Sequence, residues 1–166
     1  MTVSGSTLLF GAIPAALKPP TSEKRALLQF VHDLETRVAG SRPFVCLLTD
    51  DAELRRLNRD FLAHDYPTDV LSFPTNGSRG ELGEIAISME RAAAQAAEFS
   101  HTCLDEVRVL MLHGVLHLTG LDHETGAGRM AREEKRWRAE FGLPETLIAR
   151  AGSRARRVAK PRKGAA

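Results

Sequence analysis

Three histidines within eleven consecutive positions constrain this chain more than any other feature of its sequence. His113 and His117 stand four residues apart in an apolar stretch that predicts a helix over about residues 104–120. Residues with this spacing lie about 6 Å apart along a helix axis and about 40° apart around it, so both rings can reach one metal ion. Gly120 can adopt a left-handed conformation that ends the helix, and the turned chain can then bring back His123 as a third ligand.

Three neutral imidazole nitrogens suit one Zn²⁺ ion per chain. Such a set leaves a fourth position on the zinc ion for water. Binding to zinc lowers the pKa of that water from about 15.7 to roughly 7, so hydroxide is available at neutral pH. We therefore predict His113, His117 and His123 as metal ligands, with the metal-bound water as the catalytic group. In the alternative interpretation they are two packed helix histidines and a turn residue, which the spacing and the intervening glycine disfavour. Asp122 either orients a ligand histidine or caps the turn.

Length and composition indicate an ordinary globular domain. The chain has 166 residues and a mean hydropathy of −0.21, and a chain of this length can bury a core without disulfides. Cys46 and Cys103 stand in apolar segments and are predicted to be free core thiols. The longest apolar stretch, residues 8–17, is too short to span a bilayer and lacks the basic flank of a secretory signal. We expect a cytoplasmic protein without a membrane partner.

Positive charge is concentrated at the end of the chain. Seven Lys and Arg residues follow residue 149 without any acidic residue, which leaves 16 basic against 21 acidic residues in the preceding part, a formal charge of −5. We predict one domain over residues 1–149 and a basic, disordered tail over residues 150–166. The tail either contacts RNA phosphates weakly and non-specifically or only aids solubility.

Hydrophobic periodicity and turn residues divide the domain into strands and helices. The predicted strands cover residues 7–13, 44–49, 70–73 and 82–87, the last two as a hairpin-like pair. The predicted helices cover residues 21–38, 50–64, 88–99, 104–120 and 128–141. Asp50 and Ser88 are the expected N-caps, and Leu54, Leu57 and Phe61 are expected to face inward. Because this order lacks strict βαβ regularity, we predict an α+β fold with a small mixed sheet.

The histidine spacing is similar to the zinc-binding run of the metzincin proteases, with one difference. Gly114 stands where those proteases have their general-base Glu, and glycine cannot accept a proton. A protease would therefore need another acid as its base, such as Glu84 or Asp122. Peptide hydrolysis is retained only as an alternative.

Residues 113–123 more closely resemble the signature of the YbeY family, the bacterial rRNA-maturation endoribonucleases. That signature is His-Gly-x-Leu-His-Leu-x-Gly-x-Asp-His, and the chain matches each fixed position. Two further blocks support the resemblance. They are residues 57–65 continuing into Pro-Thr-Asp-Val-Leu-Ser-Phe-Pro at 67–74, and Leu-Gly-Glu-Ile-Ala-Ile-Ser at 82–88. The resemblance extends over about residues 44–143.

The resemblance implies a zincin-like metal-binding helix in a single-strand-specific, zinc-dependent endoribonuclease. It further implies a role in 16S rRNA 3′-end maturation and ribosome quality control, with single-stranded ribosomal RNA and the small ribosomal subunit and its proteins as partners. A zinc ion there would polarise a phosphoryl oxygen and either deliver hydroxide or activate a neighbouring ribose hydroxyl. The alternatives are a metalloprotease-like hydrolase and a ribosome-assembly factor whose zinc is structural.

The chain departs from the family pattern at two places. The family usually has Arg, Gly and Lys before Asp65, whereas this chain has Leu62-Ala63-His64, so a substrate-binding cation is missing. Arg59, one helical turn earlier, is the predicted phosphate contact in its place. A solvated helix arginine is the alternative, and Arg56 or the tail could compensate equally well. Leu121 replaces the usual Tyr, which removes a hydroxyl and leaves the predicted ligands in place.

Overall fold

The computed structural model describes residues 5–75, 80–121 and 128–144 and is built on a four-stranded sheet. The strands are β1 (Thr7–Phe10), β2 (Phe44–Thr49), β3 (Val70–Pro74) and β4 (Gly83–Ser88), in the order β1-β2-β4-β3. β1, β2 and β4 run parallel, and β3 pairs antiparallel with β4. The predicted mixed sheet, and the predicted pairing of its third and fourth strands, are confirmed.

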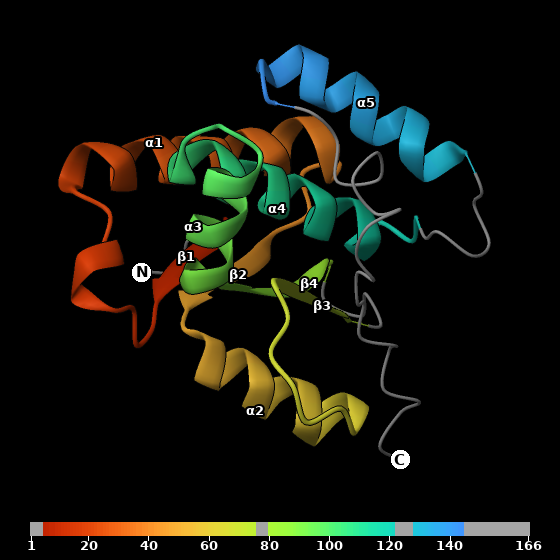
Figure 1. The fold of residues 1–166 in the computed structure, drawn as a ribbon. Helices are drawn as coiled ribbons and strands as arrows, with labels where there is room; N and C mark the ends of the chain where they lie inside the picture. Colours follow the sequence, from red (N-terminus) through yellow and green to blue (C-terminus); the bar gives the residue numbers. More distant parts are fainter. Residues whose placement is uncertain (1–4, 76–79, 122–127, 145–166) are drawn as a thin grey trace.

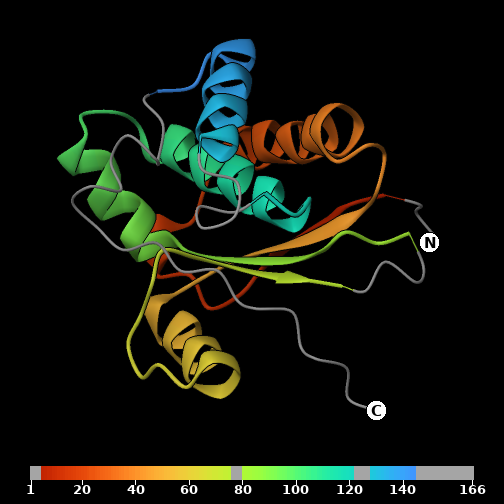
Figure 2. The same ribbon diagram turned by 90° about the vertical axis from the view of Figure 1, so that its right-hand side faces the viewer.

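Helices cover both faces of this sheet (Figures 1 and 2). Four of them lie on one face: α1 (Thr21–Asp33), α3 (Met89–Glu98), α4 (Cys103–Leu118) and α5 (Arg129–Phe141). The fifth, α2 (Asp51–Leu62), lies on the opposite face. This arrangement confirms the predicted α+β class. Of the helices in the described part of the chain, none has the length and apolar character needed to cross a membrane.

The helix that carries the histidine pair is the most deeply buried one. α4 packs directly against β3 and β4 and is covered in turn by α1, α3 and α5. Every residue of α4 from Val109 to Leu118 is buried. A helix enclosed on all sides must be largely apolar, which explains why the two histidines are the only polar side chains between Val109 and Leu118.

Strand alternation divides the interior into two clusters. Cys46, Ile85 and Ile87 point toward α4 and join the main core, whereas Leu71 and Ala86 point toward α2 and pack on Leu54. The prediction of Cys46 as a core thiol is confirmed, and burial raises its pKa to about 12. Cys103 is only half-buried and packs at the margin of the main core.

Element boundaries agree with the predictions to within about two residues except at two places. β1 ends at Phe10 because the chain turns after Gly11 into a short 3-10 helix, η1 (Ala15–Leu17). The predicted helix over residues 21–38 is continuous, but its last five residues form a π-helix, η2 (Leu34–Val38). The expected caps are confirmed, since Asp50 accepts a hydrogen bond from the backbone N–H of Glu53 and Ser88 from that of Arg91.

Phe61 points toward the sheet as predicted, but its side chain is incompletely covered. Leu54 is fully buried and Leu57 is half-buried, but Phe61 is 41% exposed. Its ring packs edge-on against Phe73 of β3, at a centroid distance of 5.4 Å. Phe61 stands in the last turn of α2, the helix that forms the outer layer on its side of the sheet (Figure 2).

Gly83 permits a close approach between β4, β3 and α4. Its φ of +148° is unfavourable for residues with a side chain. A Cβ atom at this position would lie 2.4 Å from the carbonyl oxygen of Phe73 and 2.8 Å from Cδ2 of Leu118. The glycine in the block at residues 82–88 therefore allows the sheet to meet the last turn of α4, next to His117.

Candidate metal centre

His113 and His117 lie one turn apart on α4 and are 1% and 4% exposed. Their Nε2 atoms are 3.0 Å apart, and their rings are inclined at 74° with centroids 4.6 Å apart. Both rings therefore share one face of α4, as their four-residue spacing predicts. Their role as metal ligands stays a prediction.

The geometry of this pair fits a zinc site. Two imidazole nitrogens that bind one tetrahedral zinc ion at about 2.0–2.1 Å lie about 3.3 Å from each other. The observed separation of 3.0 Å is close to that value. Within the ranges that the structure describes, no group of three His, Cys, Asp or Glu residues gathers around one point. The predicted third ligand, His123, and its neighbour Asp122 lie outside these ranges.

The exit from α4 follows the predicted geometry. Gly120 has a φ of +97°, and its N–H donates to the carbonyl of His117 at 3.0 Å. The N–H of Leu121 donates to the carbonyl of Leu116 at 3.2 Å, which closes the helix. The left-handed conformation predicted for Gly120 is confirmed.

Glu134 is a candidate functional residue that the sequence motifs did not single out. It belongs to α5, is 1% exposed, and places Oε2 3.3 Å from Nδ1 of His113. A carboxylate in this position can orient an imidazole whose other nitrogen binds a metal. A signal was present in the sequence, because Glu134 falls on the same helical stripe as Met130, Trp137 and Phe141.

Gly114 faces the sheet. A Cβ atom at this position would lie 2.9 Å from Cγ2 of Ile85, so the glycine allows α4 to approach β4 closely. Its carbonyl accepts a hydrogen bond from Oγ of Ser72 at 3.2 Å. A longer side chain here would collide with β4, which gives a packing reason for the absence of the metzincin glutamate.

A buried carboxylate in the block at residues 67–74 holds the start of β3 in position. Asp69 is 4% exposed and accepts hydrogen bonds from the N–H of Val70 at 2.8 Å and from Nε2 of Gln95 at 3.0 Å. Its carbonyl accepts a further bond from the N–H of Ser88. Asp69 thus ties the start of β3 to α3 and to the end of β4. The sequence pattern pointed to this block but not to a role for Asp69.

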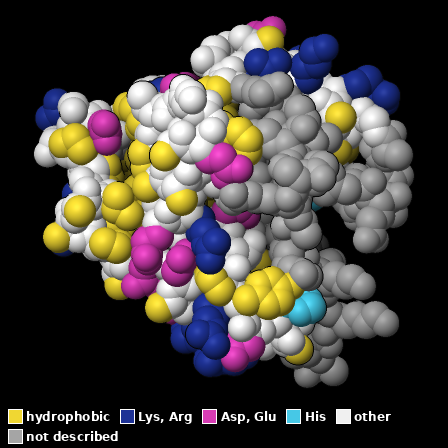
Figure 3. All heavy atoms as spheres, in the orientation of Figure 1, with side chains coloured by type: hydrophobic (Ala, Val, Ile, Leu, Met, Phe, Trp, Pro, Cys, Tyr) yellow, Lys and Arg dark blue, Asp and Glu magenta, His cyan; other side chains and the backbone are white. Residues whose placement is uncertain are grey.

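Arg59 is not brought together with the histidine pair. It is exposed on α2, which packs on the opposite face of the sheet from α4, and its Nε lies 3.2 Å from Oδ1 of Asp60. Arg56 pairs with Glu53 and Asp60 in the same way. Figure 3 shows basic and acidic side chains close together at the lower end of the molecule, over α2. The phosphate contact of Arg59 stays a prediction.

The departure from the family pattern before Asp65 has a structural counterpart. Leu62 packs against the smaller hydrophobic cluster, which lies between α2 and the sheet. The ring of His64 lies 5.5 Å from that of Tyr66. Asp65 accepts two hydrogen bonds from Arg55, at 2.8 and 3.1 Å, and this interaction lowers the pKa of Asp65. Leu62 and His64, which stand where the family usually has cations, thus make apolar and aromatic contacts.

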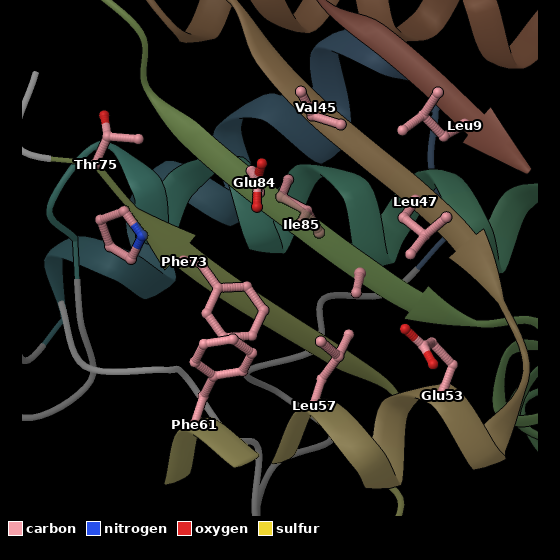
Figure 4. Close-up of a pocket in the computed structure, with 12 residues that line it drawn as sticks. Leu9, Val45, Leu47, Glu53, Leu57, Phe61, Phe73, Thr75, Glu84 and Ile85 are labelled. Atoms are coloured by element: carbon pink, nitrogen blue, oxygen red, sulfur yellow. The ribbon is translucent and has the colours of Figure 1, made fainter. Parts of the chain in front are cut away.

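A cavity of about 520 Å³ lies between α2 and the sheet (Figure 4). Its walls are mainly apolar, and Figure 4 shows Phe61 against Phe73 on one side of it. Glu53 and Glu84 contribute carboxylates at its border. Neither His113 nor His117 lines it, because α4 packs on the opposite face of the sheet. This cavity is therefore separate from the candidate metal centre.

Comparison with known proteins assigns the family. A family model described as Endoribonuclease YbeY matches residues 21–142, which include the histidine pair and Glu134. The chain belongs to the YbeY endoribonuclease family. This membership confirms the resemblance and places the chain among nucleases, within the hydrolases.

Individual members of the YbeY family are similar over most of their length. Endoribonuclease YbeY of Solibacter usitatus (strain Ellin6076) is 55% identical over 149 residues, covering 90% of this chain and 97% of that relative. Endoribonuclease YbeY of Koribacter versatilis (strain Ellin345) is 46% identical, covering 76% and 84%. The solution structure of TM1509 from Thermotoga maritima shares the fold, with a TM-score of 0.57 and 24% identity over 82% of this chain and 91% of that one.

Proposed function

We propose that the chain is a zinc-dependent endoribonuclease that cleaves single-stranded RNA in 16S rRNA 3′-end maturation and ribosome quality control. The observation that carries the proposal is the buried histidine pair, whose Nε2 atoms converge to 3.0 Å in a member of an endoribonuclease family. His113, His117 and His123 would hold one Zn²⁺ ion. The proposed partners are single-stranded ribosomal RNA and the small ribosomal subunit with its proteins, in the cytoplasm.

The packing of α4 and its neighbours orients the histidine pair in the absence of any ligand. When bound, zinc supplies a Lewis acid for a phosphoryl oxygen and a nucleophile at neutral pH. Burial of α4 holds the two imidazoles in fixed orientations, which reduces the cost of ordering them on binding. The left-handed exit at Gly120 redirects the chain only three residues after His117. Gly114 supplies no proton acceptor, which disfavours the protease alternative.

Metal removal tests the proposal. Treatment with a chelator is expected to lower cleavage of a single-stranded 16S rRNA 3′-end fragment about 10³-fold or more, and one equivalent of Zn²⁺ should restore it. Cleavage is followed on gels, and metal content is determined by mass spectrometry on the same samples. A duplex of the same sequence serves as the uncleaved control.

Two outcomes would contradict the proposal. Undiminished cleavage by metal-free protein would exclude a zinc-dependent reaction. A zinc-loaded protein that leaves the single strand intact would favour the assembly-factor alternative, in which the metal is structural.

Deletion of residues 150–166 tests the contribution of the basic tail to RNA binding. The deletion removes seven positive charges and is expected to weaken binding and flatten its dependence on salt, by about 0.7 in log–log slope for each phosphate that the tail neutralises. Fluorescence anisotropy of a labelled single strand across a series of salt concentrations measures the slope. Zinc content should stay unchanged, and an identical slope in the two proteins would leave the tail without this role.

A further inference from the structure

Glu134 is a buried carboxylate on a helix whose other charged residues are largely exposed. It is 1% exposed and lies one turn from Met130, which is equally buried. Removing a carboxylate from water is costly unless hydrogen bonds or charges compensate. The side chain is oriented toward the histidine pair, with Oε2 3.3 Å from Nδ1 of His113.

The two ring nitrogens of His113 have different neighbours. Nδ1 lies at hydrogen-bond distance from Glu134, and Nε2 lies 3.0 Å from Nε2 of His117. A neutral imidazole carries its single proton on one nitrogen and a lone pair on the other. Because a carboxylate only accepts hydrogen bonds, Glu134 favours the proton on Nδ1 and leaves the lone pair on Nε2, toward His117.

The position of Glu134 is set by contacts of α5 that do not involve His113. Phe141 packs edge-on against Phe30 of α1 with ring centroids 5.1 Å apart. The guanidinium of Arg37 lies 4.8 Å from the ring centroid of Phe141 and forms an ion pair with Glu140 at 3.3 Å. These contacts hold α5 beside the end of α1, so the carboxylate is presented to His113 by the packing of the fold.

We infer that Glu134 is a positioning residue for the metal centre. Its carboxylate accepts the Nδ1–H of His113 and so holds Nε2 as the nitrogen that presents a lone pair to a divalent cation. The inference rests on the proposed function for the identity of that cation. The tautomer itself belongs to the metal-free protein and can be measured there.

The first test is the tautomer of His113 in metal-free protein, recorded at mildly alkaline pH. Long-range ¹H–¹⁵N NMR spectra of imidazole-labelled protein are expected to show the Nδ1–H form in the wild type and in Glu134→Gln, whose amide oxygen still accepts. Glu134→Leu should shift the ring toward the Nε2–H form. A wild-type His113 protonated on Nε2 would overturn the inference, even if the leucine variant does not fold.

The second test is the affinity for Zn²⁺, measured by competition with a chelating dye. Glu134→Leu is expected to raise the Kd about 10–100-fold and Glu134→Gln by less. The matched control is Glu133→Gln, because Glu133 is the preceding residue of α5 and pairs with Arg136. The control should bind zinc as tightly as the wild type.

The two hypotheses fail in different ways. A folded Glu134→Leu variant with wild-type affinity and an unchanged tautomer would overturn the positioning role while the proposed function stands. A wild type without zinc affinity, in which His113 still carries its proton on Nδ1 and loses it in Glu134→Leu, would overturn the proposed function and support the orientation of His113 by Glu134.

Discussion

Replacement of His117 by Ala is expected to remove most of the bound zinc and to reduce cleavage of single-stranded RNA about 10³-fold or more. The imidazole of His117 supplies one of the two nitrogens that converge to 3.0 Å on α4, and alanine supplies none. A site with only two of its three predicted histidine ligands loses both its affinity for zinc and its coordination geometry. Zinc per chain and cleavage rate are to be measured on the same preparations.

His32→Ala is the matched control for this prediction. His32 is exposed on α1, so the substitution removes an imidazole without touching the buried pair. Wild-type zinc content in His117→Ala would contradict the assignment of this ligand. Equal cleavage by His117→Ala and the wild type would indicate a contaminating nuclease or a reaction that does not depend on this site.

His117→Ala also separates the contribution of the metal to the free energy of unfolding from the contribution of side-chain packing. In the presence of a chelator, His117→Ala is expected to lose about 1–3 kcal/mol of unfolding free energy, the range typical of substitutions in a packed interior. With zinc present the difference from the wild type should grow, because a ligand that binds only the folded state stabilises it. Denaturant unfolding with and without zinc measures both contributions. An unchanged difference would show that the metal does not stabilise the fold through His117.

Replacement of Gly83 by Ala is expected to be strongly destabilising, with a loss of about 2–4 kcal/mol of unfolding free energy. A Cβ atom would stand 2.4 Å from the carbonyl oxygen of Phe73, and backbone atoms cannot move aside as a side chain can. The backbone φ of +148° adds strain for any residue except glycine. Relief of this contact requires β4 to shift against β3 and the last turn of α4.

Gly40→Ala separates these two causes. Gly40 also has a positive φ, +62°, but a Cβ atom there would meet nothing within 4 Å. The control should therefore lose only the conformational cost, about 1–2 kcal/mol. Both variants are compared by denaturant unfolding in the presence of a chelator. If Gly83→Ala loses no more than Gly40→Ala, the close approach to Phe73 does not limit this position.

Features that depend on neighbours along the chain could be predicted from the sequence. The shared face of His113 and His117 follows from the pitch of a helix, and the conformation of Gly120 follows from the need to end one. The caps at Asp50 and Ser88 involve atoms three residues away, and both were correct. The motif at residues 113–123 led to the family, and the match over residues 21–142 confirms it.

The tertiary structure decided which distant segments meet. Glu134 falls on the helical stripe of Met130, Trp137 and Phe141, but this position does not indicate His113, which is 21 residues away, as its neighbour. The approach of Gly114 to Ile85 and the position of Arg59 across the sheet from α4 depend on how layers stack. A pattern of apolar residues indicates that a side chain is buried, but it does not specify the residues against which that side chain packs. Only the packing of the whole sheet and its helices selects one of them, and that selection places a carboxylate behind the histidine pair.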